Sequence, residues 1–159
     1  MASDALIQQL VARIDQLESR NAMRDLVTTY CRGFDRGNYE QFLSIWWEDC
    51  VWDIGPPFGM FQGHAGIDQA VKGVLWPVWR ETHHLTSNLQ IVFEGADDAR
   101  GECDVDCMGA TRDDVVQMIS ATYRDHFQRR NGIWKIKRRD VTIHYFNPIP
   151  GAQMTAPKG

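Results

Sequence analysis

The stretch VVQMISATYRDHFQRRNGIWKIKRRDVTIHYF (residues 115–146) decides the fold, because it holds the clearest β-hairpin signal in the chain. Asn131-Gly132 lies between two long runs in which aromatic and β-branched residues alternate with polar ones. A two-residue type I′ turn needs positive φ at both central positions, which asparagine and glycine adopt most readily. The stretch therefore predicts two long antiparallel strands joined at this turn.

Two more runs with strand-like period precede the hairpin. They are HHLTSNLQIVF (83–93) and ARGECDVDCMGA (99–110), and the polar links EGADD and TRDD follow them. Successive strands joined by short polar links pair as neighbours in an antiparallel meander. We therefore expect the second half of the chain to form a long-stranded antiparallel sheet.

The first half of the chain changes to helical periodicity. Apolar residues recur at spacings of three and four, the pattern of an amphipathic helix. The first helix is expected over Leu6, Ile7, Leu10, Val11, Ile14 and Leu17, and a second, capped by Asn21, over Met23, Leu26, Val27, Tyr30, Cys31 and Phe34. Asp35 then lies at the end of the second helix, beside its buried stripe.

Shorter elements are expected between residues 38 and 77. Asn38 with Gln41 resembles a capping box, which predicts a third helix that ends near Trp47. CVWDI (50–54) is strand-like and GPPFG (55–59) is a turn, followed by a fourth helix over 67–75 that Pro77 terminates. Helices first and a sheet afterwards indicate an α+β domain whose helices cover one face of a curved, mostly antiparallel sheet. We expect one domain over 1–150 and a tail over 151–159.

Composition narrows the classes of function. The chain has 159 residues, 43% of them hydrophobic, with a net charge of −4, and its Lys and Arg residues are scattered. No basic patch for nucleic acid is present, and neither a secretory signal nor a membrane-spanning run is expected. Four cysteines, Cys31, Cys50, Cys103 and Cys107, form no CxxC pair, which predicts free thiols in a reducing cytoplasm and excludes a zinc ribbon.

Two adjacent histidines are the first candidates for chemistry. Period-two counting places His84, Thr86, Asn88 and Gln90 on one strand face and His83, Leu85, Leu89, Ile91 and Phe93 on the other. Parity alone makes the apolar face the core and sends His84 outward, unless the polar face lines a cavity and the apolar face packs in an oligomer. The alternation leaves both arrangements open.

Several segments resemble one family along nearly the whole chain. They are GFD (33–35), LSIWWEDCVW (43–52), GVLWPVWRETHHLTSNLQIVF (73–93), ATYRDHFQRRNGIWKIKRRD (121–140) and HYFNPIPG (144–151). They are similar to the hexachlorocyclohexane dehydrochlorinases of the SnoaL-like branch of the nuclear-transport-factor-2-like superfamily, which also includes scytalone dehydratase and a bile-acid dehydratase. The resemblance implies a cone-shaped, cystatin-like α+β barrel, a homotrimer packed through its sheets, and chemistry without a cofactor.

The resemblance also implies a catalytic pair. The family's aspartate matches Asp35, and the last histidine of its HETIH motif matches His84 rather than His83. In such a pair Asp35 accepts the Nδ1 proton of His84, so that Nε2 is free to remove a proton from carbon. Without the resemblance, Asp35 reads as a solvated carboxylate at a helix end.

The family's arginine matches Arg139, where a fixed charge can stabilise a leaving anion or orient the pair. Period two places Arg139 on one face with Val141, Ile143 and Tyr145, so an arginine there needs a buried partner; the alternative is a surface arginine paired with Asp140 or Asp125.

Tyr30 departs from the dehydrochlorinase pattern, which has a lysine there. Hydroxide is a poor leaving group and needs a proton from a group such as a phenol, whereas chloride needs only electrostatic help. Tyr30 therefore favours loss of water, although a tyrosine on a buried stripe is equally a core residue.

Aromatic residues are expected to line an apolar substrate pocket. The candidates are Phe42, Trp46, Met60, Phe61, Trp76 and Trp79, although tryptophans and phenylalanines in stripes are usually core. Asp106, with Asp104 on the same strand face, is a candidate contact for a substrate hydroxyl, and a solvent-facing pair is the commoner arrangement. No metal site is expected.

Taken together, these residues predict a cofactor-independent lyase that performs β-elimination, dehydration or dehydrochlorination, on a cyclic apolar molecule. His84 is the expected base, Asp35 its orienting partner, Arg139 the anion stabiliser and Tyr30 the proton donor. One alternative is an isomerase or cyclase that acts through an enol or enolate; another is a non-catalytic binding or assembly module of the same fold.

Overall fold

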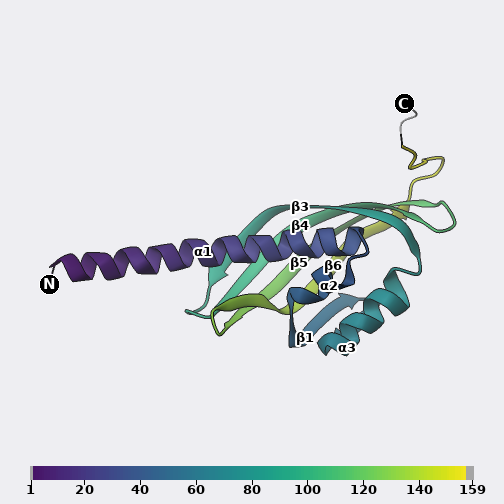
Figure 1. Ribbon diagram of the computed structural model, residues 1–159. Helices are drawn as coiled ribbons and strands as arrows, with labels where there is room; N and C mark the ends of the chain where they lie inside the picture. The colour runs from purple at the N-terminus through teal and green to yellow at the C-terminus, as the bar shows by residue number, and fades with distance from the viewer. Residues whose placement is uncertain (1, 157–159) are drawn as a thin grey trace.

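The computed structural model describes residues 2–156 and shows helices packed on one face of a curved sheet. The sheet has six strands in the order β2-β1-β6-β5-β4-β3. The strands are β1 (Trp46–Gly55), β2 (Gly59–Gln62), β3 (Trp79–Phe93), β4 (Asp98–Thr111), β5 (Val116–Arg130) and β6 (Ile133–Pro148). A long helix, α1 (Ala2–Asp35), crosses this face, and α2 (Tyr39–Ser44) and α3 (Gly63–Asp68) lie below it (Figure 1). This is the predicted α+β arrangement.

The hairpin predicted at Asn131-Gly132 forms. Asn131 and Gly132 have φ of 50° and 80°, and Arg130 pairs with Ile133 on either side of them. β3, β4, β5 and β6 follow one another as an antiparallel meander. β1 pairs with β6 in the parallel direction, which places the segment after α2 between β6 and the edge strand β2.

The first two predicted helices are a single helix. α1 runs without interruption from Ala2 to Asp35, so the cap predicted at Asn21 is wrong. No glycine or proline occurs between residues 2 and 32, and nothing therefore breaks the helix where its apolar stripe changes face. The later stripe, with Met23 and Val27, is buried on the sheet, whereas the earlier one, with Leu10 and Ile14, is exposed.

The elements between residues 38 and 77 are shorter than expected. Asn38 Oδ1 accepts a hydrogen bond from the backbone N of Gln41 at 3.1 Å, which confirms the predicted cap of α2. The helix ends at Ser44 rather than near Trp47, because Trp46 already belongs to β1. The predicted turn is present and leads into β2, which was not expected. The fourth helix begins at Gly63 and continues as a π-helix, η1 (Gln69–Leu75), before Pro77.

A β-bulge in β3 corrects the predicted faces of that strand. The register with β4 shifts between Ser87 and Gln90, and Asn88 adopts a φ of 56°. His84 therefore faces the helices together with Leu89 and Ile91, which the simple alternation placed on opposite faces. One extra residue reverses the parity of everything after it. His84 can therefore face inward on the same side of the strand as the apolar core residues that follow the bulge.

A second bulge, in β6, has the same effect on Tyr145. Ala121 pairs with Ile143, but Ser120 pairs with Tyr145, so His144 is the extra residue. Arg139, Val141 and Ile143 face inward as predicted, whereas Tyr145 lies on the outer face and does not share their side. The prediction for Tyr145 was wrong because alternation was carried through the bulge.

The core is built from aromatic side chains of α1, α2 and β1, with Cys31, Cys50, Cys103 and Cys107 as buried free thiols. Among residues 2–156, none of the helices combines the length and apolar character needed to cross a membrane. Residues 151–156 of the predicted tail form a turn followed by irregular backbone, and residues 157–159 lie outside the described part of the chain.

Candidate active site

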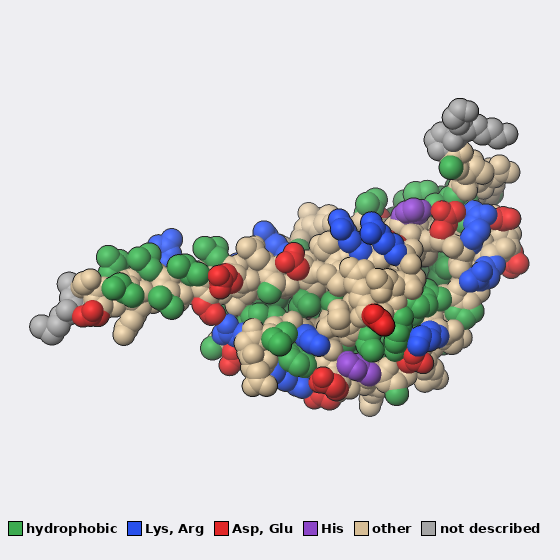
Figure 2. Space-filling view, in the orientation of Figure 1, with side chains coloured by type: hydrophobic (Ala, Val, Ile, Leu, Met, Phe, Trp, Pro, Cys, Tyr) green, Lys and Arg blue, Asp and Glu red, His purple; other side chains and the backbone are tan. Residues whose placement is uncertain are grey.

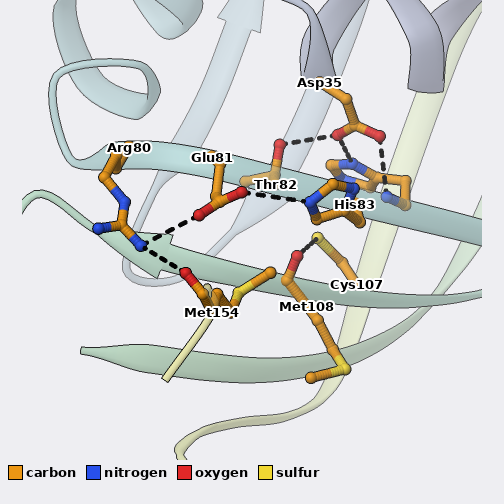
Figure 3. A network of polar contacts seen from close by, with 9 residues as sticks. Asp35, Arg80, Glu81, Thr82, His83, Cys107, Met108 and Met154 are labelled. Atoms are coloured by element: carbon orange, nitrogen blue, oxygen red, sulfur yellow. Dashed lines mark hydrogen bonds and ion pairs between the residues drawn. The ribbon is translucent and has the colours of Figure 1, made fainter. Parts of the chain in front are cut away.

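The candidate site is built around the carboxylate of Asp35, which ends α1 directly above β3. His84 Nδ1 lies 2.5 Å from Asp35 Oδ1, Thr82 Oγ1 donates to the same oxygen at 2.7 Å, and the backbone N of His84 donates to Oδ2 at 2.9 Å. Figure 3 shows Asp35 pointing from the helix end toward Thr82 on the strand. The carboxylate is held on both oxygens, and it in turn holds the imidazole.

A close approach of two helices sets the position of Asp35. Gly33 packs against the backbone of Phe42 in α2, and a Cβ built on Gly33 would lie 2.8 Å from the Phe42 backbone N. Glycine is the residue that permits such contact between backbones. The end of α1, and with it Asp35, is therefore held between α2 and the sheet.

The charge state of Asp35 follows from these contacts. Burial favours the neutral acid, but the hydrogen bonds and charge of His84, with the Thr82 hydroxyl, hold the pKa of Asp35 below its usual 3.8. A carboxylate accepts the Nδ1 proton, which leaves the Nε2 lone pair of His84 available as a base. Both side chains are largely buried, at 10% exposure for His84 and 18% for Asp35.

His84 forms part of the wall of an apolar cavity. The cavity has about 600 Å³ of empty space, which includes its opening to solvent. Its lining residues come from α1, η1 and five strands: Tyr30, Phe34, Trp52, Ile54, Phe58, Leu75, Trp79, Thr82, His84, Val105, Cys107, Ile119, Ala121, Tyr123, Val141 and Ile143. Most of this wall is apolar, so the few polar side chains in it are the candidates for chemistry.

Two tyrosines line the cavity beside the imidazole, one in contact with its ring and the other in contact with the first tyrosine. The ring centre of Tyr30 is 6.2 Å from that of His84 and 5.5 Å from that of Tyr123. Burial is the largest influence on both phenols and raises the pKa of each, although the charge of Arg139 opposes the rise. Both phenols are therefore protonated at neutral pH, and their rings contact each other edge to face.

Arg139 lies behind the two tyrosines and does not line the cavity. Its guanidinium is fully buried, and Nε and Nη2 donate to Asp125 Oδ1 and Oδ2, each at 2.7 Å. The guanidinium carbon lies 4.2 Å from the ring centre of Tyr30 and 4.3 Å from that of Tyr123. Burial disfavours the charge, but Asp125 outweighs it and raises the pKa of Arg139. The sequence left Asp140 and Asp125 as possible partners of Arg139, and in the structure the partner is Asp125.

The structure brings only part of the predicted pocket together. Trp79 lines the cavity, and Trp76 lines a polar hollow next to it, where its indole N donates to the Phe34 carbonyl at 3.2 Å. The other five predicted residues lie outside this cavity wall. Phe42, Trp46 and Phe61 are core residues, Met60 is 51% exposed on β2, and Asp106 lies on the outer sheet face near the Tyr145 hydroxyl. Stripe periodicity identifies buried residues but does not say which of them border a cavity.

Sequence reasoning missed Tyr123, Trp52 and Phe34 as cavity residues. A usable signal exists for Tyr123, which alternates with Asp125 and Ala121 on the buried face of β5. Trp52 pairs with Arg139 across the parallel β1–β6 contact, which no local pattern indicates. His83 is exposed and lies near Glu81, at 3.5 Å (Figure 3). Of the two histidines, the structure therefore brings only His84 to the cavity.

The helices and the curved six-stranded sheet define the class of small α+β proteins with a cystatin-like fold. The chain belongs to the SnoaL-like family, whose domain model matches residues 15–140. It is 34% identical over 145 residues to hexachlorocyclohexane dehydrochlorinase 1 of Sphingobium indicum, with 91% of this chain and 94% of that protein covered. The γ-hexachlorocyclohexane dehydrochlorinase of the same species is 32% identical, with coverage of 91% and 92%.

Solved structures agree with this assignment. The crystal structure of a type 2 hexachlorocyclohexane dehydrochlorinase, LinA, superposes with a TM-score of 0.86 at 35% identity and covers 91% of this chain and 98% of that one. A scytalone dehydratase-like protein of Novosphingobium aromaticivorans has a TM-score of 0.78 at 21% identity, with coverage of 89% and 94%. The second likeness shows the shared fold, and the first shows that relatives with this architecture are lyases.

Proposed function

We propose that this protein is a cofactor-independent lyase that performs β-elimination on a cyclic, largely apolar small molecule. The observation that carries the proposal is the Asp35–His84 contact of 2.5 Å at the wall of an apolar cavity. An imidazole held at Nδ1 by a carboxylate is a general base at Nε2. The relatives with dehydrochlorinase activity support elimination as the class of reaction.

In the proposed reaction, His84 Nε2 removes a proton from a substrate carbon. The electron pair of that C–H bond becomes the second bond of an alkene, and the bond from the adjacent carbon to the leaving group breaks. Asp35 stabilises the resulting imidazolium without taking its proton. A positioned base of this kind contributes a rate factor of roughly 10²–10⁴.

Tyr30 is the proposed proton donor for a leaving oxygen. Its ring contacts the His84 ring edge to face at 6.2 Å between centres, and both side chains line the cavity, so a substrate in the cavity can present a C–H bond to His84 and the adjacent C–O bond to Tyr30. The departing hydroxyl takes the phenolic proton and leaves as water. Tyr123, whose ring contacts that of Tyr30, is the proposed hydrogen-bond donor to the Tyr30 phenolate, and solvent returns the His84 proton to Tyr30 before the next turnover.

Arg139 is proposed to act on the phenols rather than on the substrate. Its charge lies over both tyrosine rings and lowers the cost of transient charge on Tyr30. Asp125 fixes the guanidinium at two points, so the charge is already in place before any proton moves. Arg139 is therefore a positioning residue for the proton donor, not a direct binder of the leaving anion.

The leaving group distinguishes two forms of this proposal. Chloride release from γ-hexachlorocyclohexane by the purified protein, beside its Asp35→Asn variant, tests the first. Release by the wild type alone establishes a dehydrochlorinase and makes Tyr30 a tolerated replacement for lysine. Absence of release directs the test to hydroxylated ring and steroid substrates, with alkene absorbance as the readout. Equal turnover by Asp35→Asn on any substrate would contradict the site itself.

The tyrosine pair also favours a second candidate, isomerisation or ring closure through an enol. Removal of the same proton without loss of a leaving group needs only donors to an enolate oxygen, and Tyr30 and Tyr123 are two such donors. Exchange of substrate hydrogen for solvent deuterium without loss of water distinguishes this candidate. A non-catalytic module would bind ligand equally well in the His84→Ala variant and catalyse nothing in the wild type.

We also propose that the protein is a cytoplasmic homotrimer that packs through its outer sheet faces. Exposed apolar side chains on β3, β4 and β5 support such packing: Leu85, Val92, Met108 and Met118. The four buried free thiols suit a reducing compartment. A charged replacement of Leu85, which is 71% exposed, tests the interface by its effect on solution mass.

A further inference from the structure

The first half of α1 carries apolar side chains that no other part of residues 2–156 covers. Figure 1 shows this part of the helix projecting beyond the sheet, and Figure 2 shows hydrophobic side chains gathered along it. The exposed stripe consists of Leu6, Ile7, Leu10, Val11, Ile14 and Leu17, each between 47% and 62% exposed. Each of these residues leaves about half of its surface exposed to water, which is a large exposed apolar area for a segment this short.

The stripe faces away from the body of the domain. The helix packs on the sheet through Ser19, Met23 and Val27, which are 4% exposed or less. At 3.6 residues per turn, the exposed stripe lies on roughly the opposite side of the helix from these residues. Asp15, on the sheet side, bonds Arg129 of β5 at 2.6 Å and fixes this rotation. The domain therefore cannot fold back over its own stripe.

The spacing in the stripe is that of a coiled-coil seam. Ile7 and Ile14 take the a positions of two successive heptads, and Leu10 and Leu17 take the d positions. β-branched residues at a with leucine at d favour two parallel strands. The seam is about two heptads long, and the folded domain nucleates the helix that carries it.

We propose that this stripe binds the same stripe of a second copy of the chain, as a parallel two-stranded coiled coil. Charges beside the seam support this occupant. Arg13 takes the g position and Glu18 the e position of the next heptad, the pair that meets between parallel helices. An antiparallel arrangement would oppose Arg13 to Arg13 of the second copy. The inference is independent of the proposed reaction.

The placement of the domains permits this pairing. Because each stripe faces away from its own sheet, two parallel helices joined at their stripes carry the two domains on opposite outer sides. A lipid surface suits the segment less well. Its polar side holds Asp15 and Glu18 against the single basic Arg13, whereas membrane-surface helices are rich in Lys and Arg.

Solution mass tests the proposal with the full chain. Sedimentation equilibrium of the wild type is compared with the Leu10→Lys/Ile14→Lys variant and with Gln9→Lys, an exposed control at a c position, away from the seam. We expect the double variant to have half the mass of the wild type at equal concentration, and Gln9→Lys to match the wild type. Assembly through the outer sheet face is untouched in all three proteins. Equal masses for the wild type and the double variant would overturn the proposal.

Disulfide formation tests the parallel register. All four native cysteines are buried, so a cysteine introduced in the stripe is the exposed thiol. Equivalent d positions face each other in a parallel pair, and Leu10→Cys should give a covalent dimer on mild oxidation, whereas Gln9→Cys should not. Failure of Leu10→Cys to cross-link would contradict the parallel pair. Binding to anionic vesicles that depends on the stripe, with the same mass for the wild type and the double variant, would assign the stripe to lipid instead.

Discussion

Arg139 and Asp125 form a fully buried two-point ion pair, with Nε–Oδ1 and Nη2–Oδ2 both at 2.7 Å, beneath the rings of Tyr30 and Tyr123. The pair neutralises a charge in the core and places that charge where a phenol must give up its proton. The ion pair lies both in the core of the sheet and next to the phenols of the cavity, so variants of the pair should change the stability of the fold and the rate of the reaction.

Loss of one partner of this pair should destabilise the fold. Asp125→Ala leaves the buried guanidinium without a counter-charge, and such loss costs about 3–5 kcal/mol. Urea unfolding followed by circular dichroism measures the change. Glu102→Ala, which removes an ion pair exposed at 54% and 57%, is the control and should cost at most about 1 kcal/mol. Equal effects of the two variants would show that the buried pair adds no stability.

The two neighbouring histidines offer a matched comparison. His84→Gln should lower kcat by roughly 10²–10⁴, because the base is lost. His83→Gln should leave kcat within a factor of about two, because His83 is exposed and outside the cavity wall. Steady-state kinetics on the substrate found by the elimination assays measures both. A larger loss in His83→Gln would reverse the assignment.

Tyr30→Phe separates the two leaving groups. With a hydroxylated substrate, loss of the phenolic proton should lower kcat by roughly 10²–10⁴, whereas loss of chloride should change by less than about tenfold. Tyr123→Phe removes only the proposed donor to Tyr30 and should have a smaller effect on water loss. Retained dehydration in Tyr30→Phe would return Tyr30 to the role of a core residue.

Asp35 should contribute to acid stability. Its pKa is lower in the folded protein than in the unfolded chain, so its stabilisation is present above its unfolded pKa and is lost as pH falls through the folded pKa. Below the usual value of 3.8, the free energy of unfolding of the wild type should fall more steeply than that of Asp35→Asn. Urea titrations at several pH values measure this difference, and identical slopes would exclude it.

Gly33 should be intolerant of a side chain. A Cβ there would approach the Phe42 backbone N to 2.8 Å, so Gly33→Ala should push α2 away and destabilise the protein by about 1–3 kcal/mol. Gly73→Ala is the control, since a Cβ there meets nothing within 4 Å. Because Asp35 follows Gly33 by two residues, Gly33→Ala should also lower kcat. Unchanged stability would show that α2 yields without cost.

Local patterns determined much of the architecture. Asn131-Gly132, with positive φ at both residues, defines the β5–β6 turn, and period-two runs define the long strands on either side. The Asn38 cap of α2 was equally readable, because a cap depends on residues three positions apart. The alignment of Asp35 with His84 came from the resemblance, since the alternation alone left the facing of His84 open.

The tertiary structure decided what depends on residues far apart in the chain. The bulge at Asn88 turned Leu89 and Ile91 to the side of His84, and no local pattern marks where a curving strand takes an extra residue. The cavity wall, with Trp52 and Tyr123, depends on which elements meet across the sheet, so periodicity predicted buried aromatics but not the ones that border space. The sequence by itself determined the α+β class, the four long strands and their order. The packing of distant side chains determined the site, because a cavity is formed only by what surrounds it.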